Sequence, residues 1–383
     1  MIYLDFAAST PIHPQALEVY TQVATRYFGN ASSLHDQGSS SKQIVEASSK
    51  VIASGINGSP KGLTFTSGAT ESNFLAIQAL LDARSDDRKQ IISTRMEHSS
   101  VINVLERLSG QGYQIRWANV LADGCIDLDH LNKLLIEKTA LVTVQHVNSE
   151  LGVIQPIKEI GNILKHTTVL FHSDCVQSFG KIPIDVTDWG LDAISISGHK
   201  IYGPKGIGAV WINSDTDWKP LFKDYNQKKS LRFGTANTPG IAAFAAAAKW
   251  MISNQHSEYE RISKIRSLLV DGFVKNHPRV IIEGSPEHQS PYILGIRYIG
   301  LEGQYLMLEC SQAGLAISTG SACQVGSDAP NRSMMAIGKT DEEARQFVRL
   351  SFGIGIDEAK IKEIIAKIDS ILNKHFKIIK NNI

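Results

Sequence analysis

The chain of 383 residues is 43% hydrophobic and 20% charged, an ordinary composition for a globular protein with a sizeable core. Its 39 basic and 38 acidic side chains nearly cancel, so no overall charge would recruit nucleic acid or an anionic membrane. The length exceeds what one hydrophobic core usually supports, and we therefore expect two domains.

Short apolar runs alternate with amphipathic helical patterns over the first two-thirds of the chain. The spacing of Val101, Val104, Leu105 and Leu108 is typical of a helix that buries one face. The alternation predicts an α/β fold in which a mostly parallel sheet lies between layers of helices. We expect the following runs to be strands buried on both faces: Leu63–Thr66, Ile91–Ser93, Leu141–His146, Val169–Asp174, Ala193–Ser197 and Gly208–Ile212.

Polar residues follow several of these runs at the point where each strand is expected to end. In open α/β sheets, a ligand binds beyond the carboxyl ends of the strands. We therefore expect one edge of the sheet to collect the side chains of Thr66, Ser67, His146, Asp174, Ser197, His199 and Lys200.

The pattern changes after about residue 255, where the charge density rises and the elements become shorter. We expect a large domain over residues 13–255 and a smaller α+β domain formed by residues 1–12 and 256–383. The N-terminal MIYLDFAAST does not read as a secretory signal, and no run approaches the roughly 18 apolar residues of a membrane span. Four cysteines in a chain of this length do not indicate a disulfide framework, which predicts a reduced, cytoplasmic protein.

The segment SGHKIYGPKG places Lys200 directly after an expected buried strand, in a glycine-rich turn. Partial burial lowers the pKa of an ammonium group and so favours the free amine that a Schiff base requires. A surface turn with ordinary lysines is the alternative interpretation.

Two other strand ends carry residues that suit an anionic aromatic ligand. The segment TSGATE, which includes Ala69 and Thr70, opens a helix over Phe74–Leu81, and the N–H groups of a helix start attract anions. Asp174 could pair with a protonated pyridine nitrogen, and Gln177 could reach a ring hydroxyl. An ordinary N-cap and an aspartate that caps a turn are the alternatives.

Further candidates lie in loops and in the second domain. His98 could stack on a flat ring or be an ordinary loop residue. Cys323 lies in the small-residue segment STGSAC, which suits a reactive thiol, whereas Cys175 is expected to be structural. Arg349 could grip a carboxylate with its planar fork or form a surface ion pair. No His/Cys grouping has the spacing of zinc ligands, so no metal site is expected.

Together these segments resemble the cysteine desulfurases of the NifS/IscS type, in the class V aminotransferase group of fold-type I pyridoxal-phosphate (PLP) enzymes. The resemblance runs from Tyr3 to about Gly353, and several independent motifs occur in the family's order. They are YLDFAASTP, FGNASSLH, FTSGATES, MEHSSV, HSDCVQ, SISGHKIYGPKG, RFGTAN, STGSAC and RLSFG. The resemblance implies a PLP-dependent homodimer that converts L-cysteine to L-alanine and keeps the sulfur as an enzyme persulfide. A sulfur-acceptor protein, such as an iron–sulfur scaffold, would then receive it.

The resemblance also implies catalytic roles for residues of this chain. Lys200 would carry PLP and move the proton of the substrate α-carbon. Cys323 would take the sulfur, and Arg349 would bind the carboxylate of cysteine.

The remaining implied roles concern the cofactor. Asp174 would pair with the pyridine nitrogen and Gln177 with the 3-hydroxyl group, while His98 would stack on the ring. The phosphate would be held by Ala69, Thr70, Ser197 and His199, and by Thr235 from the partner subunit.

Some positions depart from the family's pattern. Ser149 stands where many relatives have an asparagine that touches the 3-hydroxyl group, and the shorter serine would need a bridging water. The segment Lys223–Lys228 replaces a glycine-rich stretch that usually approaches the neighbouring site of the dimer. The variant HVNSE, with HSDCVQ and STGSACQVG, resembles a NifS branch linked to NAD biosynthesis, which implies quinolinate synthase as a candidate acceptor.

Two alternatives stay open at this point. Another class V activity, an aminotransferase or a selenocysteine lyase, would keep Lys200 and Asp174 but would not need the thiol of Cys323. A non-catalytic scaffold would need neither Lys200 nor Cys323.

Overall fold

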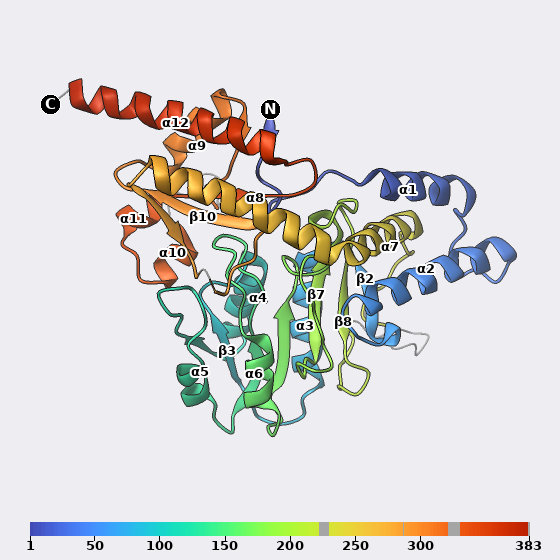
Figure 1. The fold of residues 1–383 in the computed structure, drawn as a ribbon. Coiled ribbons are helices and arrows are strands. Elements are labelled where there is room, and N and C mark those ends of the chain that lie inside the picture. The colour runs from blue at the N-terminus through green and yellow to red at the C-terminus, as the bar shows by residue number, and fades with distance from the viewer. Residues whose placement is uncertain (222–229, 286, 321–329, 382–383) are drawn as a thin grey trace.

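The computed structural model describes residues 1–221, 230–285, 287–320 and 330–381 (Figure 1). Its largest sheet has seven strands, of which β8 runs antiparallel to both neighbours and the others run parallel. In spatial order they are β2 (Leu63–Thr66), β8 (Gly208–Ile212), β7 (Ala193–Ser197), β6 (Leu170–Asp174), β5 (Thr139–Thr143), β3 (Gln90–Thr94) and β4 (Gln114–Ala118). The predicted mostly parallel α/β sheet is confirmed.

The predicted strands differ from the observed ones in a few places. Residues 63–66, 193–197 and 208–212 match the prediction at both ends. β5 covers Thr139–Thr143 instead of Leu141–His146, so His146 lies beyond the strand. β2 is partly exposed, where full burial was expected. β4 was not predicted, because this edge strand alternates exposed and partly buried residues and lacks a continuous apolar run.

Successive residues of a strand point to opposite faces of the sheet, and different helices cover the two faces. Ile91 of β3 belongs to the hydrophobic cluster formed with α3 (Ala69–Ala83) and α4 (Ser99–Ser109). Its neighbour Ile92 belongs to the cluster that includes α6 (Ile157–Leu164) and α7 (Thr238–Ser253). The sheet therefore lies between two helical layers, as the alternating pattern of the sequence predicts.

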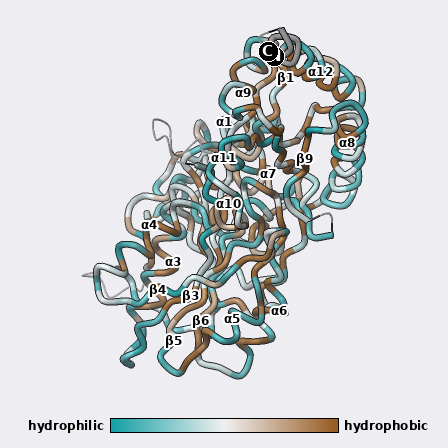
Figure 2. Tube along the Cα trace, turned by 90° about the vertical axis from the view of Figure 1, so that its left-hand side faces the viewer, coloured by the Kyte–Doolittle hydropathy of each residue, from teal (hydrophilic) through white to brown (hydrophobic). Residues whose placement is uncertain are grey.

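A smaller antiparallel sheet occupies the C-terminal part of the chain, in the order β12 (Phe347–Ser351), β10 (Ile293–Tyr298), β9 (Val280–Glu283). The helices α8 (Gln255–Asn276) and α12 (Glu358–Asn381) pack together beside it. Figure 2 shows hydrophilic and hydrophobic stretches alternating along both helices, as expected where one face is buried.

The N-terminal strand β1 (Ile2–Tyr3) pairs in parallel with β11 (Leu315–Ala316). This pairing supports the assignment of residues 1–12 to the smaller domain, although the boundaries at 13–255 and 256–383 stay a prediction. The other elements are α1 (Pro14–Arg26) and α2 (Asp36–Ser54), which pack against α7, the short turns η1 (Pro60–Gly62) and η2 (Gly198–Lys200), α5 (Leu128–Leu134), α9 (Gly303–Gln312), α10 (Arg332–Ala336) and α11 (Asp341–Arg345). Among the helices described, none has the length and hydrophobicity to cross a membrane.

Gly161 in α6 offers a test of how tightly this helix packs on the sheet. Alanine normally favours a helix over glycine by roughly 1 kcal/mol. Here, a Cβ atom on residue 161 would overlap the backbone carbonyl of Trp189. We expect Gly161→Ala to lower the free energy of unfolding by about 1–3 kcal/mol in urea denaturation. Asn162→Ala, at an exposed position of the same helix, is the control; a Gly161→Ala variant as stable as that control would contradict the packing.

Candidate active site

A cavity of ≈ 580 Å³ lies at the carboxyl edge of the large sheet, a size typical of small-molecule sites. The segments that follow β2, β3, β5, β6 and β7 all contribute to its wall, together with residues of the N-terminal segment and of the smaller sheet. The lining includes most of the residues that the sequence singled out: Ala69, Thr70, His98, Ser149, Asp174, Gln177, His199, Lys200 and Arg349.

Lys200 lies at the end of η2, directly after β7. Its Nζ atom donates to the backbone carbonyl oxygens of Ala7 at 2.6 Å and Ala8 at 2.8 Å. Tyr202, in the same turn, has a φ of +67°, which is a strained conformation for a residue with a side chain. Its backbone N–H donates to Thr10 Oγ1 at 2.8 Å. The N-terminal segment thus holds both the lysine and the turn that carries it.

Asp174 ends β6 and is only 6% exposed. Its Oδ2 atom accepts from Asn73 Nδ2 at 2.8 Å, and its Oδ1 atom accepts from the N–H of Val176 at 3.0 Å. Asn73 Nδ2 also donates to Ser100 Oγ at 2.9 Å, which lies 2.8 Å from Nδ1 of His98. A buried hydrogen-bonded chain therefore connects the carboxylate with the imidazole. Asn73 was not among the predicted site residues, although it lies one helical turn after Thr70.

The start of α3 forms a cradle for an anion. Its N-cap residue, Gly68, makes no side-chain capping bond, so this residue offers no side-chain acceptor to the first amides of the helix. Gly68 has a φ of +151°, and a Cβ atom there would meet no atom within 4 Å, which leaves open space at the helix start. Ser67, Gly68 and Thr70 all line the cavity. These features fit the phosphate group of PLP.

Ser197 and His199 lie on either side of Gly198 at the end of β7. Ser197 Oγ is buried and has no hydrogen-bond partner among the described residues, and Ser197 itself does not line the cavity. Burial, followed by the positive charges of Lys200, Lys205 and Lys181, lowers the pKa of His199 to about 4. The imidazole is therefore neutral at physiological pH, and it can donate one N–H to a ligand.

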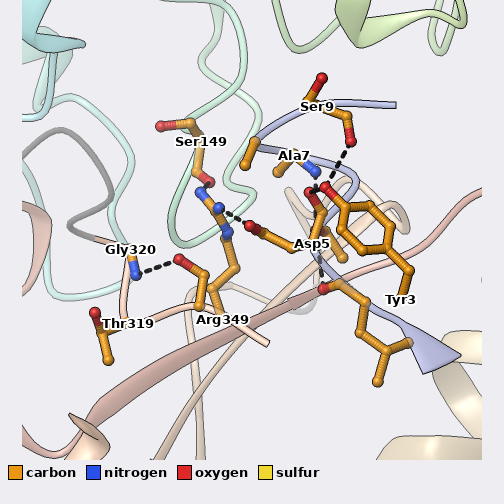
Figure 3. Close-up of polar contacts among 12 residues, drawn as sticks. Tyr3, Asp5, Ala7, Ser9, Ser149, Thr319, Gly320 and Arg349 are labelled. Carbon is orange, nitrogen blue, oxygen red and sulfur yellow. Dashed lines mark hydrogen bonds and ion pairs between the residues drawn. The ribbon is translucent and has the colours of Figure 1, made fainter. Parts of the chain in front are cut away.

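Arg349 reaches the cavity from β12 of the smaller sheet (Figure 3). Its Nη1 atom donates to the carbonyl oxygen of Ser149 at 2.7 Å, and its Nη2 atom lies 2.6 Å from Asp5 Oδ1. Arg349 is only 4% exposed, and its Nε atom has no partner among the described residues. The alternative of a surface ion pair is wrong, because the pair is formed by a buried guanidinium.

Lys181 is a further buried cation, which the sequence analysis missed. It is 4% exposed, and its Nζ atom lies 3.4 Å from Gln177 Oε1. Gln177 Nε2 in turn donates to the carbonyl oxygen of Ala7 at 2.9 Å. Because an ammonium group can only donate, Lys181 requires the oxygen of this amide on its own side and leaves the NH2 group facing Ala7. Burial, with the nearby positive charges of Lys200 and Arg349, lowers the pKa of Lys181 to about 7. Nothing in the local sequence marks a lysine that becomes buried only through contacts with distant segments.

Other predicted residues lie away from the cavity. His146 is buried and faces Trp189 with a ring-centroid separation of 4.9 Å, so it is not part of the predicted cluster at the sheet edge. Its backbone still lies at that edge, where its N–H donates to the carbonyl oxygen of Asp174 at 2.9 Å, but its side chain points away from the cavity that its neighbours Gln145 and Val147 line. Thr235 is exposed and does not line the cavity of this chain. Cys323 and Lys223–Lys228 lie outside the described residues.

The thiols that the structure describes are those of Cys125, Cys175 and Cys310, and all three are buried. Burial raises the pKa of Cys175 to about 12, which keeps it a thiol at physiological pH. The expected structural character of Cys175 agrees with this environment.

The buried Lys181 predicts a pH-dependent stability. Its pKa is about 7 in the folded protein and close to 10.5 in the unfolded chain, so the unfolded chain binds more protons between these pH values. The penalty of burying the lysine is therefore largest below pH 7 and disappears as the pH rises towards 10.5. We expect the free energy of unfolding of Lys181→Met, relative to wild type, to fall between about pH 6 and about pH 10.

Urea denaturation at several pH values measures this trend. Lys165→Met, at an exposed position, makes the same chemical change without the burial and is the matched control. If the free energy of unfolding of Lys181→Met, relative to wild type, changes with pH no more than that of Lys165→Met, the lowered pKa of Lys181 is contradicted.

Comparisons with known proteins agree with this geometry. Residues 2–364 match the family model described as aminotransferase class-V. A protein of Bacillus subtilis (strain 168), provisionally named as the cysteine desulfurase NifS, is 42% identical over 367 residues, which cover 95% of this chain and 93% of that protein.

Solved structures give the same result. A structure described as a NifS-like protein superposes with a TM-score of 0.90 at 29% identity, covering 97% of this chain and 99% of that one. Another, described as SspA in complex with cysteine, gives a TM-score of 0.81 at 30% identity, covering 92% and 99% of the two chains. These likenesses confirm the expected fold-type I architecture. The chain belongs to the class-V aminotransferase family, together with the cysteine desulfurases of the NifS/IscS type.

Proposed function

We propose that this protein is a PLP-dependent cysteine desulfurase that converts L-cysteine to L-alanine and transfers the sulfur to Cys323. The observation that carries this proposal is the convergence of Lys200, Asp174, the start of α3 and Arg349 on one cavity. An amine, a carboxylate, an anion cradle and a guanidinium are the groups that PLP and an amino-acid substrate require. The names of the relatives supply the specific reaction.

The cofactor-binding roles are assigned to residues that fit each part of PLP. Asp174 would pair with the pyridine nitrogen, and His98 would stack on the ring. Gln177 and Ser149 would serve the 3-hydroxyl group. The phosphate would be held at the start of α3 by Ala69 and Thr70, with Ser197 and His199, and with Thr235 of a second subunit. When bound, PLP supplies an electron sink for the substrate α-carbon.

The catalytic roles fall to three residues. Lys200 carries the cofactor and moves the proton of the α-carbon with its amine. Arg349 binds the substrate carboxylate through its N–H groups. The thiolate of Cys323 would attack the substrate sulfur, so that a new S–S bond replaces the C–S bond. The electron pair of the C–S bond would remain with the carbon, which becomes the methyl group of alanine by taking up one proton, equivalent to the one that the substrate thiol loses as the persulfide anion forms. Gly320, three residues before Cys323 in the sequence, lines the cavity, which supports this assignment.

We further propose a cytoplasmic homodimer. Large apolar side chains on and after α1 are exposed in the single chain, which supports their burial by a second copy: Leu17, Tyr20, Tyr27, Phe28 and Leu34. Thr235 would then act in the partner's site.

We propose an iron–sulfur scaffold or quinolinate synthase as the sulfur acceptor. Quinolinate synthase is suggested by the motif variant around Ser149, which resembles a NifS branch linked to NAD biosynthesis. The test is to reconstitute the iron–sulfur cluster of quinolinate synthase with and without this protein. If the cluster forms equally well in both cases, quinolinate synthase is rejected as the acceptor.

Cys323→Ala tests the desulfurase reaction. We expect the variant to keep the visible absorption of bound PLP and to lose persulfide formation and alanine release from L-cysteine, by roughly 10²-fold or more. Both products are measured on purified protein supplied with PLP. Cys125→Ala, which removes a buried thiol away from the cavity lining, is the control and should retain both.

Unchanged alanine release by Cys323→Ala would contradict the assignment of the thiol. Activity with selenocysteine but not with cysteine in the wild type would favour a selenocysteine lyase. A protein that takes up no PLP would favour the non-catalytic scaffold.

A further inference from the structure

We propose that Asp5 is a positioning residue that orients Arg349 for the carboxylate of an α-amino acid, and that the segment carrying Asp5 couples this anchor to Lys200. The segment comprises residues 3–10, and we call it the N-terminal strap. This inference rests on the proposed function, in which Arg349 binds the substrate carboxylate.

The first step is the geometry around the guanidinium (Figure 3). Arg349 Nη2 donates one N–H to Asp5 Oδ1 at 2.6 Å, and Arg349 Nη1 donates one N–H to the carbonyl oxygen of Ser149 at 2.7 Å. Arg349 lines the cavity, whereas Asp5 does not. The carboxylate of Asp5 therefore contacts the guanidinium from outside the cavity and does not occupy the space that a substrate carboxylate would take. Each of the two nitrogens keeps one N–H, and together they can grip a carboxylate.

The second step is the cost of burying a cation. Arg349 is 4% exposed, and Asp5 is the carboxylate in direct contact with it among the described residues. Removing one partner of a buried ion pair leaves an uncompensated charge, and the freed side chain then adopts other conformations. Glu150 is partly buried near Arg349, but its carboxyl is hydrogen-bonded to Ser333. Among the described residues, Asp5 is therefore the charged group that orients this guanidinium, together with the carbonyl of Ser149.

The third step is the rigidity of the strap itself. The hydroxyl group of Tyr3 lies 2.9 Å from the carbonyl oxygen of Asp5 and 2.9 Å from that of Ser9, which closes the strap into a tight bend. The N–H of Ala7 donates to Ser351 Oγ at 2.9 Å, which ties the bend to β12, the strand that carries Arg349.

The strap also contacts Lys200. The carbonyls of Ala7 and Ala8 accept from Lys200 Nζ, only two or three residues after Asp5. One short, rigid segment therefore holds both the amine that carries the cofactor and the partner of the carboxylate anchor.

The experiment uses PLP-loaded protein and two ligands that differ only in the carboxylate. L-Alanine has the amine and the carboxylate, and ethylamine is its counterpart without the carboxylate. Binding of each is followed by the change in the visible absorption of the cofactor. We expect Asp5→Ala to weaken L-alanine binding by about ten- to hundredfold and to leave ethylamine binding unchanged. Asp5→Asn, which keeps the shape and loses the charge, should give a smaller loss.

Asp86→Ala is the matched control, because Asp86 forms an ion pair with Arg84 at the protein surface. It should change neither affinity. Urea denaturation of each variant checks that the fold is kept, and the KM for L-cysteine should rise in Asp5→Ala more than kcat falls.

The outcomes separate the positioning role from the proposed function. Equal weakening of both ligands, or unchanged L-alanine binding, in Asp5→Ala would overturn the role of Asp5. Arg349→Ala serves as the reference for the anchor itself. If Arg349→Ala weakens L-alanine and Asp5→Ala does not, only the inference on Asp5 fails. If Arg349→Ala leaves L-alanine binding intact, the carboxylate anchor of the proposed function fails, and the inference fails with it.

Discussion

The strands β2, β3, β5, β6 and β7 run in the same direction, and this shared direction places their carboxyl ends at one edge of the sheet. Residues far apart in the chain therefore meet there, among them Thr70, His98, Asp174 and Lys200. The strand β8 runs the other way, but its start lies at the same edge because it follows Lys200 through a short turn. Without a common strand direction, these side chains would lie at opposite ends of the sheet.

The cavity brings together charged groups of both signs. Its lining includes the cations Lys200, Lys205, Arg332 and Arg349 and the carboxyl groups of Glu71, Glu97, Glu150 and Asp174, and Lys181 is buried beside it. Burial raises the pKa of Glu97 and that of Glu150, which favours their neutral forms and shifts the balance towards positive charge. The start of α3 adds the positive end of a helix dipole at the same edge. The pKa values of Lys181 and His199 are lowered first by burial and then by the positive charges near them.

Much of the architecture follows from local patterns. The strands at residues 63–66, 193–197 and 208–212 were predicted with their correct bounds, because a continuous apolar run between turn residues is a local signal. The edge strand β4 lacks such a run and was missed. The place of the His146 side chain was predicted wrongly for a different reason, since the backbone of residue 146 does pair with Asp174 at the sheet edge, but only its neighbours Gln145 and Val147 face the cavity. Asn73 escaped notice because a buried amide in a helix looks like an ordinary polar residue until Asp174 is placed beside it.

The sequence by itself determined the α/β class, the family and the identity of the residues assigned to the cofactor, because these depend on periodicity and on motifs that are contiguous in the chain. Only the tertiary structure decided how the N-terminal segment takes part. Asp5 and Arg349 are separated by most of the chain, and their contact exists because the strap is tied to β12 through Ala7 and Ser351. The burial of Lys181 was decided in the same way. Burial and ion pairing are properties of the packed whole, and no local pattern specifies them.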